Sequence, residues 1–167
     1  MKRAVLAFAL LLAGPVLPPV GAQTLPEVQI SRFSGEPVPR FESLKHEKVN
    51  GRKGPGENYQ IAWEYTRKGL PVLITKESGE WRYVRDPSGD EVWIKKNQLD
   101  AQQTALTRGA LVLKAGRATD SSDVATIPDG KVVALERCDG DLCQISIDRF
   151  RGWAPRGQLW GAAATNG

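Results

Sequence analysis

The sequence is poor in the residues that build most catalytic and metal centres. It has one histidine, two cysteines and one methionine among 167 residues. A nucleophilic centre of the Ser-His-Asp or Cys-His type would have to use His46, which lies in a charged stretch far along the chain from both cysteines. A zinc site needs three or four converging ligands, and this set does not supply them. We therefore expect no metal, no cofactor and no catalytic centre, so the protein is predicted not to be an enzyme.

Long apolar runs are also missing after residue 22, so the mature chain is predicted to have no transmembrane segment, which needs ~20 apolar residues. Residues 1–22 combine a basic start, a short apolar run and a small-residue end, the layout of a secretory signal peptide. Residues 23–40 contain three prolines and predict an extended, partly disordered leader. The protein is therefore expected to be exported. The periplasm is the favoured compartment, and the extracellular space is the alternative.

The charged residues show no block of one sign. The formal net charge is +4, and acidic and basic side chains are interspersed along both halves of the chain. A basic excess by itself would suggest nucleic acid or a membrane surface as a partner. Charge mixed in this way is more typical of an ordinary solvated surface, so we expect no nucleic-acid partner.

The chain has no helix-length apolar periodicity after the predicted signal peptide. Apolar residues instead come in short runs, such as 70–74, 81–84 and 92–94, and glycine, proline and aspartate separate these runs. Several short strands with turn signals predict a small β-barrel or sandwich. Residues 96–99 are expected to form a single 3₁₀ turn that returns Leu99 to the core.

The second half of the chain matches the first when shifted by about 61 residues. For example, Trp153 falls on Trp93. We interpret this match as a tandem repeat in which small insertions fall in loops. The predicted domains are residues 41–100 and 101–161, followed by a tail at 162–167. Because the link between them is short and lacks glycine and proline, the halves are expected to pack against each other.

The two cysteines are predicted to form a disulfide. Cys138 and Cys143 enclose four residues at a predicted hairpin, where this spacing places two side chains opposite each other on one face. An exported protein meets an oxidising compartment, which favours the bond. A redox-active pair is the less favoured alternative, because the Cys-X-X-Cys spacing is absent. In the repeat alignment Glu77 and Arg82 take the same positions, and we expect them to form an ion pair.

Residues 49–59 read Val-Asn-Gly-Arg-Lys-Gly-Pro-Gly-Glu-Asn-Tyr, which predicts a strand end running into a shaped loop. This motif, followed by Glu-Val-Trp-Ile at 91–94, resembles the bacterial SH3-like domain over most of residues 41–99. The family motif reads approximately V-N-x-R-x-G-P-G, and the last strand reads G-W-V. Here Val92 replaces the usual glycine of the last strand.

The second half shows the converse pattern, because it keeps Gly152-Trp153 and has lost the loop motif. The resemblance implies small, strongly bent β-barrels that bind cell-wall glycopeptide or protein segments and have no catalytic centre. The predicted fold is therefore all-β, with two tandem SH3-like β-barrels packed together after the signal peptide and the leader.

The loop motif and the aromatic residues near it are the candidate binding site. The candidate ligand-binding residues are Asn50, Arg52, Tyr59, Trp63 and Tyr65. Each tyrosine can present a ring to a sugar or a proline while its hydroxyl stays in water, or can simply fill the core. Arg52 can pair with a ligand carboxylate or hold its own loop through Glu57. Trp81 and Trp93 are expected to fill the core.

We therefore predict a non-catalytic, exported binding protein whose partner is cell-wall peptidoglycan or a peptide at the cell envelope. The alternative is a structural adaptor that holds an envelope protein and has no affinity for the wall.

Overall fold

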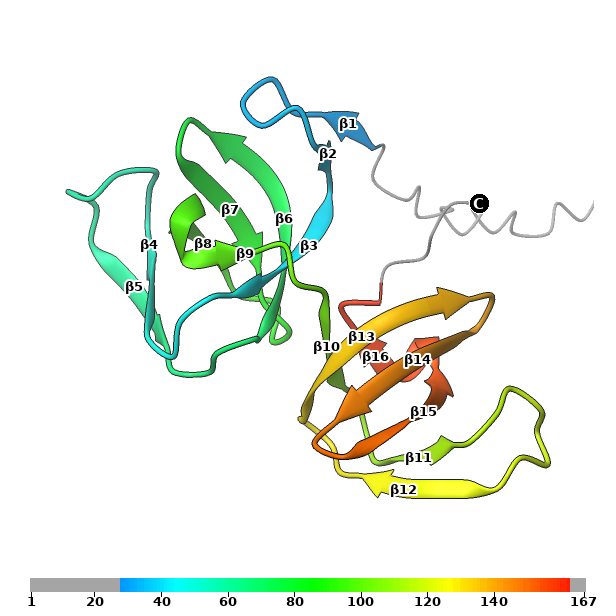
Figure 1. Ribbon diagram of the computed structural model, residues 1–167. Helices are drawn as coiled ribbons and strands as arrows, with labels where there is room; N and C mark the ends of the chain where they lie inside the picture. The colour runs from blue at the N-terminus through cyan, green and yellow to red at the C-terminus, as the bar shows by residue number, and fades with distance from the viewer. Residues whose placement is uncertain (1–27, 163–167) are drawn as a thin grey trace, which may run out of the picture.

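The structure is a computed structural model that describes residues 28–162, and the regular secondary structure of this part of the chain is β-strand apart from two short 3₁₀ turns (Figure 1). It contains two seven-stranded antiparallel sheets and a two-stranded hairpin. The all-β prediction is confirmed. The predicted signal peptide, the first residues of the predicted leader and most of the predicted tail lie outside the described residues. Among the described residues, no helix is long and apolar enough to cross a membrane.

The first sheet places its strands in the order β5-β4-β8-β7-β6-β3-β9. Its strands are β3 (Arg40–Leu44), β4 (Val49–Arg52), β5 (Ile61–Tyr65), β6 (Pro71–Ser78), β7 (Trp81–Arg85), β8 (Glu91–Lys95) and β9 (Leu99–Asp100). Alternate residues of the inner strands are buried, as in β8, where Val92 and Ile94 face the core. The predicted 3₁₀ turn is confirmed as η1 (Lys96–Gln98), which leads directly into buried Leu99.

The second sheet repeats this order as β12-β11-β15-β14-β13-β10-β16, so each strand takes the place of the strand seven earlier. Its elements are β10 (Thr104–Thr107), β11 (Leu111–Lys114), β12 (Asp123–Ile127), β13 (Val132–Asp139), β14 (Leu142–Ile147), β15 (Phe150–Pro155), η2 (Arg156–Gln158) and β16 (Leu159–Trp160). Each half has its own apolar core. Closure of the two sheets into barrels and their origin in a tandem repeat stay predictions.

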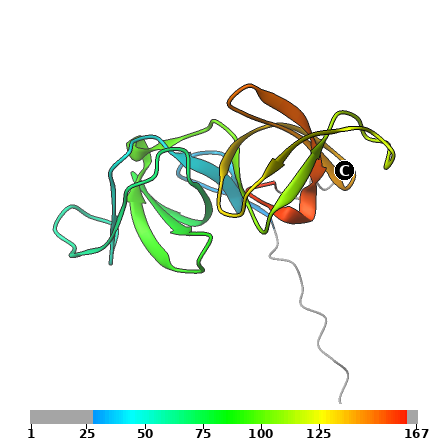
Figure 2. The same cartoon turned by 90° about the horizontal axis from the view of Figure 1, so that it is seen from below.

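The two halves lie side by side (Figure 2). They contact each other through buried polar groups. The hydroxyls of Ser43 and Thr104 are 2.7 Å apart, and the Thr104 hydroxyl donates to the carbonyl of Gly69 at 2.6 Å. The rings of Phe41 and Trp160 meet edge to face with centroids 5.3 Å apart. These contacts join residues of the first sheet to the start and the end of the second.

The described part of the predicted leader is a hairpin rather than an extended segment. Strands β1 (Gln29–Ile30) and β2 (Pro37–Val38) pair with each other and lie beside β6 (Figure 1). The hairpin turns at Gly35, whose φ of 75° favours glycine. The hydroxyls of Ser31 and Ser34 donate to the Glu77 carboxylate at 2.5 and 3.0 Å. This contact between distant segments explains why the chain is ordered here.

Glu77 also forms the predicted ion pair with Arg82, but the pair is buried. Glu77 Oε1 lies 3.2 Å from Arg82 Nε, and the two side chains are only 1% and 6% exposed. Arg40 approaches the same oxygen at 2.7 Å. Burial by itself would raise the pKa of Glu77, but hydrogen bonds from Ser31, Arg40 and Ser34 and the charge of Arg82 outweigh it, so the pKa is lowered.

At the corresponding place in the second half, Cys138 and Cys143 form the predicted disulfide, with an S–S distance of 2.01 Å. The two cysteines are directly opposed on β13 and β14, as Glu77 and Arg82 are on β6 and β7. One half therefore joins these strands by a covalent bond, and the other joins them by a buried ion pair.

Val92 on β8 stands where the family motif has glycine, and the structure gives a steric reason for this. A Cβ on Gly51 would lie 2.6 Å from a methyl carbon of Val92. In the second half the glycine and the larger side chain exchange strands, because a Cβ on Gly152 of β15 would lie 2.8 Å from Cγ of Leu113 on β11. In each half one glycine thus faces one larger side chain, between β4 and β8 in the first half and between β11 and β15 in the second.

Candidate functional site

The loop motif is held together by its own arginine. Nη1 of Arg52 donates to the carbonyl oxygen of Tyr59 at 2.7 Å, and its Nη2 lies 3.3 Å from the Glu57 carboxylate. The Tyr59 ring packs on Gly54, where any Cβ would overlap the ring. Arginine and glycine at this spacing therefore shape the loop. The structure shows Arg52 in the loop-holding role, and its binding of a ligand carboxylate stays a prediction.

Beside this loop lies a polar groove of about 170 Å³, which we call the first groove. It is lined by Lys48, Asn50, Arg52, Glu57, Trp81, Lys95 and Gln98. Glu57 stands between two cations, since Lys95 Nζ is 2.8 Å from the carboxylate oxygen that Arg52 does not approach. The hydrogen bond from Lys95 and the nearby positive charges lower the pKa of Glu57. Asn50 Oδ1 is buried and accepts no hydrogen bond from the described residues.

An exposed apolar face lies on β5, at the edge of the first sheet. Tyr59, Ile61 and Trp63 are 46%, 45% and 51% exposed. The two aromatic residues were candidates from the sequence, and Ile61 was not. Ile61 is exposed because β5 lies at the edge of the sheet, and local sequence does not show which strand lies at an edge.

Tyr65 does not belong to this exposed face, and of the two roles left open for it the structure shows the one in which it fills the core. Its side chain is 4% exposed, and its hydroxyl is 3.3 Å from Asp86 Oδ2. Burial, together with the neighbouring Asp86 carboxylate, raises its pKa. Tyr65 pairs with Val49 at the base of the β4–β5 hairpin, whereas Trp63 pairs with Gly51 further out. On β5, only Tyr65 at the base of the hairpin is buried.

The sequence analysis also missed Lys95, the second cation at Glu57. It follows Trp93 by two positions on β8, and alternation along a strand places both on the same face of the sheet. Trp93 was predicted to fill the core, but it lies on the face opposite buried Val92 and Ile94, with its ring centroid 5.0 Å from that of Tyr83. Trp81, 9% exposed, is buried as predicted.

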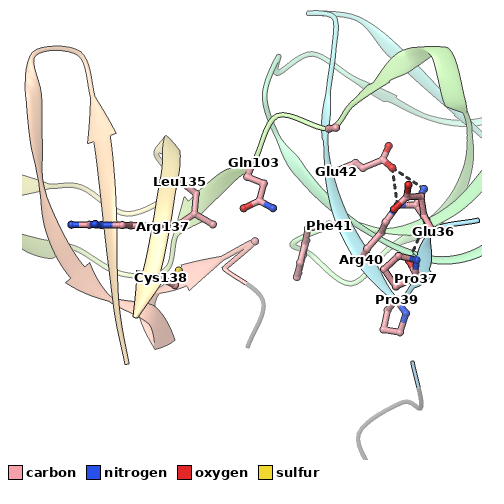
Figure 3. A pocket seen from close by; sticks show the side chains of 12 residues that line it. Glu36, Pro37, Pro39, Arg40, Phe41, Glu42, Gln103, Leu135, Arg137 and Cys138 are labelled. Carbon is pink, nitrogen blue, oxygen red and sulfur yellow. Dashed lines mark hydrogen bonds and ion pairs between the residues drawn. The ribbon is translucent and has the colours of Figure 1, made fainter. Parts of the chain in front are cut away.

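A larger cleft of about 570 Å³ lies between the two halves (Figure 3). Phe41 and the prolines beside it form one wall, and Leu135 and Cys138 lie across from them. The Arg137 guanidinium points away from the cleft in Figure 3 and lies 5.2 Å from the centroid of the Trp153 ring. Arg40 is engaged by acidic side chains on its own half. The sequence analysis predicted no site here.

The described residues contain no group of three or more His, Cys, Asp or Glu side chains that converges as metal ligands would. His46 is exposed, and both cysteines are joined in the disulfide.

Comparison with known families identifies the part of the chain that carries the first groove. A model of the bacterial SH3 domain matches residues 45–101. The chain therefore contains a bacterial SH3 domain, as the loop motif predicted. The matched residues include the shaped loop, β4, β5 and β8, and so all of the predicted site residues.

Among individual proteins, the chain is 25% identical over 119 residues to YrvJ of Bacillus subtilis (strain 168), which is provisionally named an N-acetylmuramoyl-L-alanine amidase. The alignment covers 64% of this chain and only 23% of that relative. Two solved structures, NlpC2 and NlpC1 from Trichomonas vaginalis, are each 14% identical with a TM-score of 0.34. They cover 72% and 79% of this chain and 47% and 48% of their own chains, and this likeness carries no functional argument.

Proposed function

We propose that this is a non-catalytic, exported binding protein whose bacterial SH3 domain recognises cell-wall peptidoglycan or a peptide at the cell envelope, with the periplasm as its compartment. One observation carries the proposal. The residues that match the SH3 family present exposed aromatic side chains at the edge of the sheet, and they also form a groove lined by three cations. The similarity to a protein named for N-acetylmuramoyl-L-alanine, a unit of peptidoglycan, supports the same target.

The chemistry of the two surfaces suits a glycopeptide. The rings of Tyr59 and Trp63 offer broad apolar area with few rotatable bonds, so little side-chain entropy is lost on binding. The cations of the first groove suit the carboxylates of a peptide, which would replace the exposed Glu57 carboxylate at Arg52 and Lys95. The exposed single histidine and the bonded cysteines support a binding role rather than catalysis.

Trp63→Ala is expected to weaken binding of the full chain to purified sacculi about tenfold, because an exposed aromatic anchor is removed. The measurement is the fraction of protein that sediments with sacculi over a range of wall concentrations. Ile30→Ala is the matched control, since Ile30 is also highly exposed but lies on the β1–β2 hairpin. If wild type and Trp63→Ala bind sacculi equally, the exposed aromatic residues are not part of the binding site.

The structural adaptor is the second candidate, and one observation favours it. The β1–β2 hairpin exposes Val28, Ile30 and Phe33, which are 53%, 69% and 45% accessible. Apolar side chains grouped on one small hairpin are typical of a protein contact surface.

A double change, Ile30→Ser with Phe33→Ser, is expected to abolish co-purification of an envelope protein while leaving sedimentation with sacculi unchanged. The readout is quantitative mass spectrometry of cross-linked complexes, with Trp63→Ala as the reciprocal control. A partner that is retained by the double variant would count against the adaptor role of the hairpin.

A further inference from the structure

The second half contains a groove at the place that corresponds to the first groove. It measures about 390 Å³, and its lining includes Val112, Lys114, Arg117, Leu142, Trp153 and Pro155. The strand pairing establishes the correspondence. Lys114 opposes Trp153 as Arg52 opposes Trp93, and Leu142 opposes Pro155 as Trp81 opposes Lys95. We call this the second groove. Its lining residues come mainly from β11, β14, β15 and the loop that follows β11, and Figure 1 labels these strands.

The two grooves differ in what fills them. In the first groove the protein's own carboxylate, Glu57, stands between Arg52 and Lys95. The lining of the second groove includes Lys114 and Arg117 and no acidic residue, and Pro155 takes the place of Lys95. The second groove is also more than twice as large. It therefore keeps two cations and has lost the internal carboxylate.

The cations of the second groove are paired only at the surface. Lys114 Nζ lies 2.5 Å from Asp123, and Arg117 Nη1 lies 2.6 Å from Asp139. The two aspartates are 64% and 56% exposed. Exposed pairs of this kind contribute little to stability, so a ligand carboxylate can replace either aspartate.

We propose that the second groove binds an extended peptide segment that carries a carboxylate side chain next to an aliphatic one. The carboxylate takes the place beside Lys114 and Arg117 that Glu57 occupies in the first half. The aliphatic side chain lies on Val112, which is 41% exposed, and on its neighbours Leu142 and Pro155. Positive charge beside an apolar wall complements a segment that carries a carboxylate next to an aliphatic side chain.

The environment of Trp153 favours a peptide over a sugar chain. Stacking on a sugar needs an open ring face, but Trp153 is only 7% exposed. The guanidinium groups of Arg117 and Arg137 lie 5.5 and 5.2 Å from its ring centroid. The exposed rings that suit a sugar are on the first half, so the two halves present surfaces to different partners.

The test is selection of a phage-displayed library of short random peptides on the immobilised full chain, followed by affinity measurement of the enriched peptides. We expect enriched peptides with an acidic residue beside an aliphatic one. Their binding is expected to fall by about tenfold or more in Arg117→Glu and in Val112→Glu, because each change places negative charge in the groove. Arg149→Glu is the matched control, since Arg149 is also an exposed arginine near an aromatic ring of the second half, 5.0 Å from the Phe150 centroid.

Circular dichroism and thermal unfolding verify that each variant is folded before affinities are compared. The proposal is overturned if no peptide is enriched over the Arg117→Glu protein, or if enriched peptides bind all variants alike. It is also overturned if Arg117→Glu leaves peptide binding unchanged and instead lowers sedimentation with sacculi, because the second groove would then be part of wall recognition.

Discussion

Glu77→Ala is expected to lower the free energy of unfolding by about 3 kcal/mol, because removal of one member of a buried ion pair leaves the other charge buried without compensation. Arg82 is 6% exposed and would lose its carboxylate partner. Ser31 and Ser34 would lose the acceptor that holds the β1–β2 hairpin on the first sheet. We therefore also expect faster amide hydrogen exchange in the hairpin than in the rest of the first sheet.

The measurement is denaturant unfolding at neutral pH, with Glu64→Ala as the matched control. Glu64 pairs with Lys48 at 2.9 Å, but both side chains are well exposed, so its loss is expected to cost under ~1 kcal/mol. A Glu77→Ala protein as stable as this control would show that the buried carboxylate does not hold the hairpin.

The effect of Glu77→Ala also depends on pH. The folded-state pKa of Glu77 is lowered from its ordinary value of 4.5, so its ionised form stabilises the fold above that pH. This stabilisation is lost as the pH falls through the lower, folded-state pKa. The difference in stability between wild type and Glu77→Ala should therefore be full at neutral pH and shrink in acid below about 4.5.

Gly51→Leu is expected to lower the free energy of unfolding by up to about 3 kcal/mol or to prevent folding, because the new side chain overlaps Val92 in a closely packed core. Val92→Gly alone should also be destabilising, since it opens a cavity beside Gly51. Combining the two changes reproduces the arrangement of Leu113 and Gly152 in the second half. The double variant should recover most of the stability that each single change loses.

A double-mutant cycle from urea unfolding measures this coupling, which we expect to exceed ~1 kcal/mol in favour of the double variant. Leu113→Ala serves as a control for simple loss of core volume, because it opens space without relieving an overlap. If the stability losses of Gly51→Leu and Val92→Gly simply add, the side chains at the two positions do not compete for the same space in the core.

Much of the fold could be predicted from local sequence. Strand-length apolar runs, turn residues and the absence of helical spacing predicted an all-β chain, and the structure confirms it. The Cys138–Cys143 bond and the 3₁₀ turn before Leu99 were also predictable, because both depend on residues close together in the chain. The loop motif predicted the bacterial SH3 domain, since it encodes a local backbone shape.

The site was less predictable, because it depends on which strand lies at an edge and on contacts between distant segments. Strand alternation places Trp63 and Tyr65 on one face, yet Trp63 is exposed and Tyr65 is buried against Asp86. The two grooves have corresponding backbone positions, but only the tertiary structure shows that Glu57 fills one of them.

The sequence by itself determined the secondary structure class, the disulfide and the loop shape, because backbone preference and short-range geometry act within a few residues. Only the tertiary structure decided that Ser31, Arg40 and Arg82 meet at Glu77. It also decided that Ile61 and Trp63 on β5 are exposed while Tyr65 is buried. These outcomes arise from burial, which depends on how strands far apart in sequence cover one another.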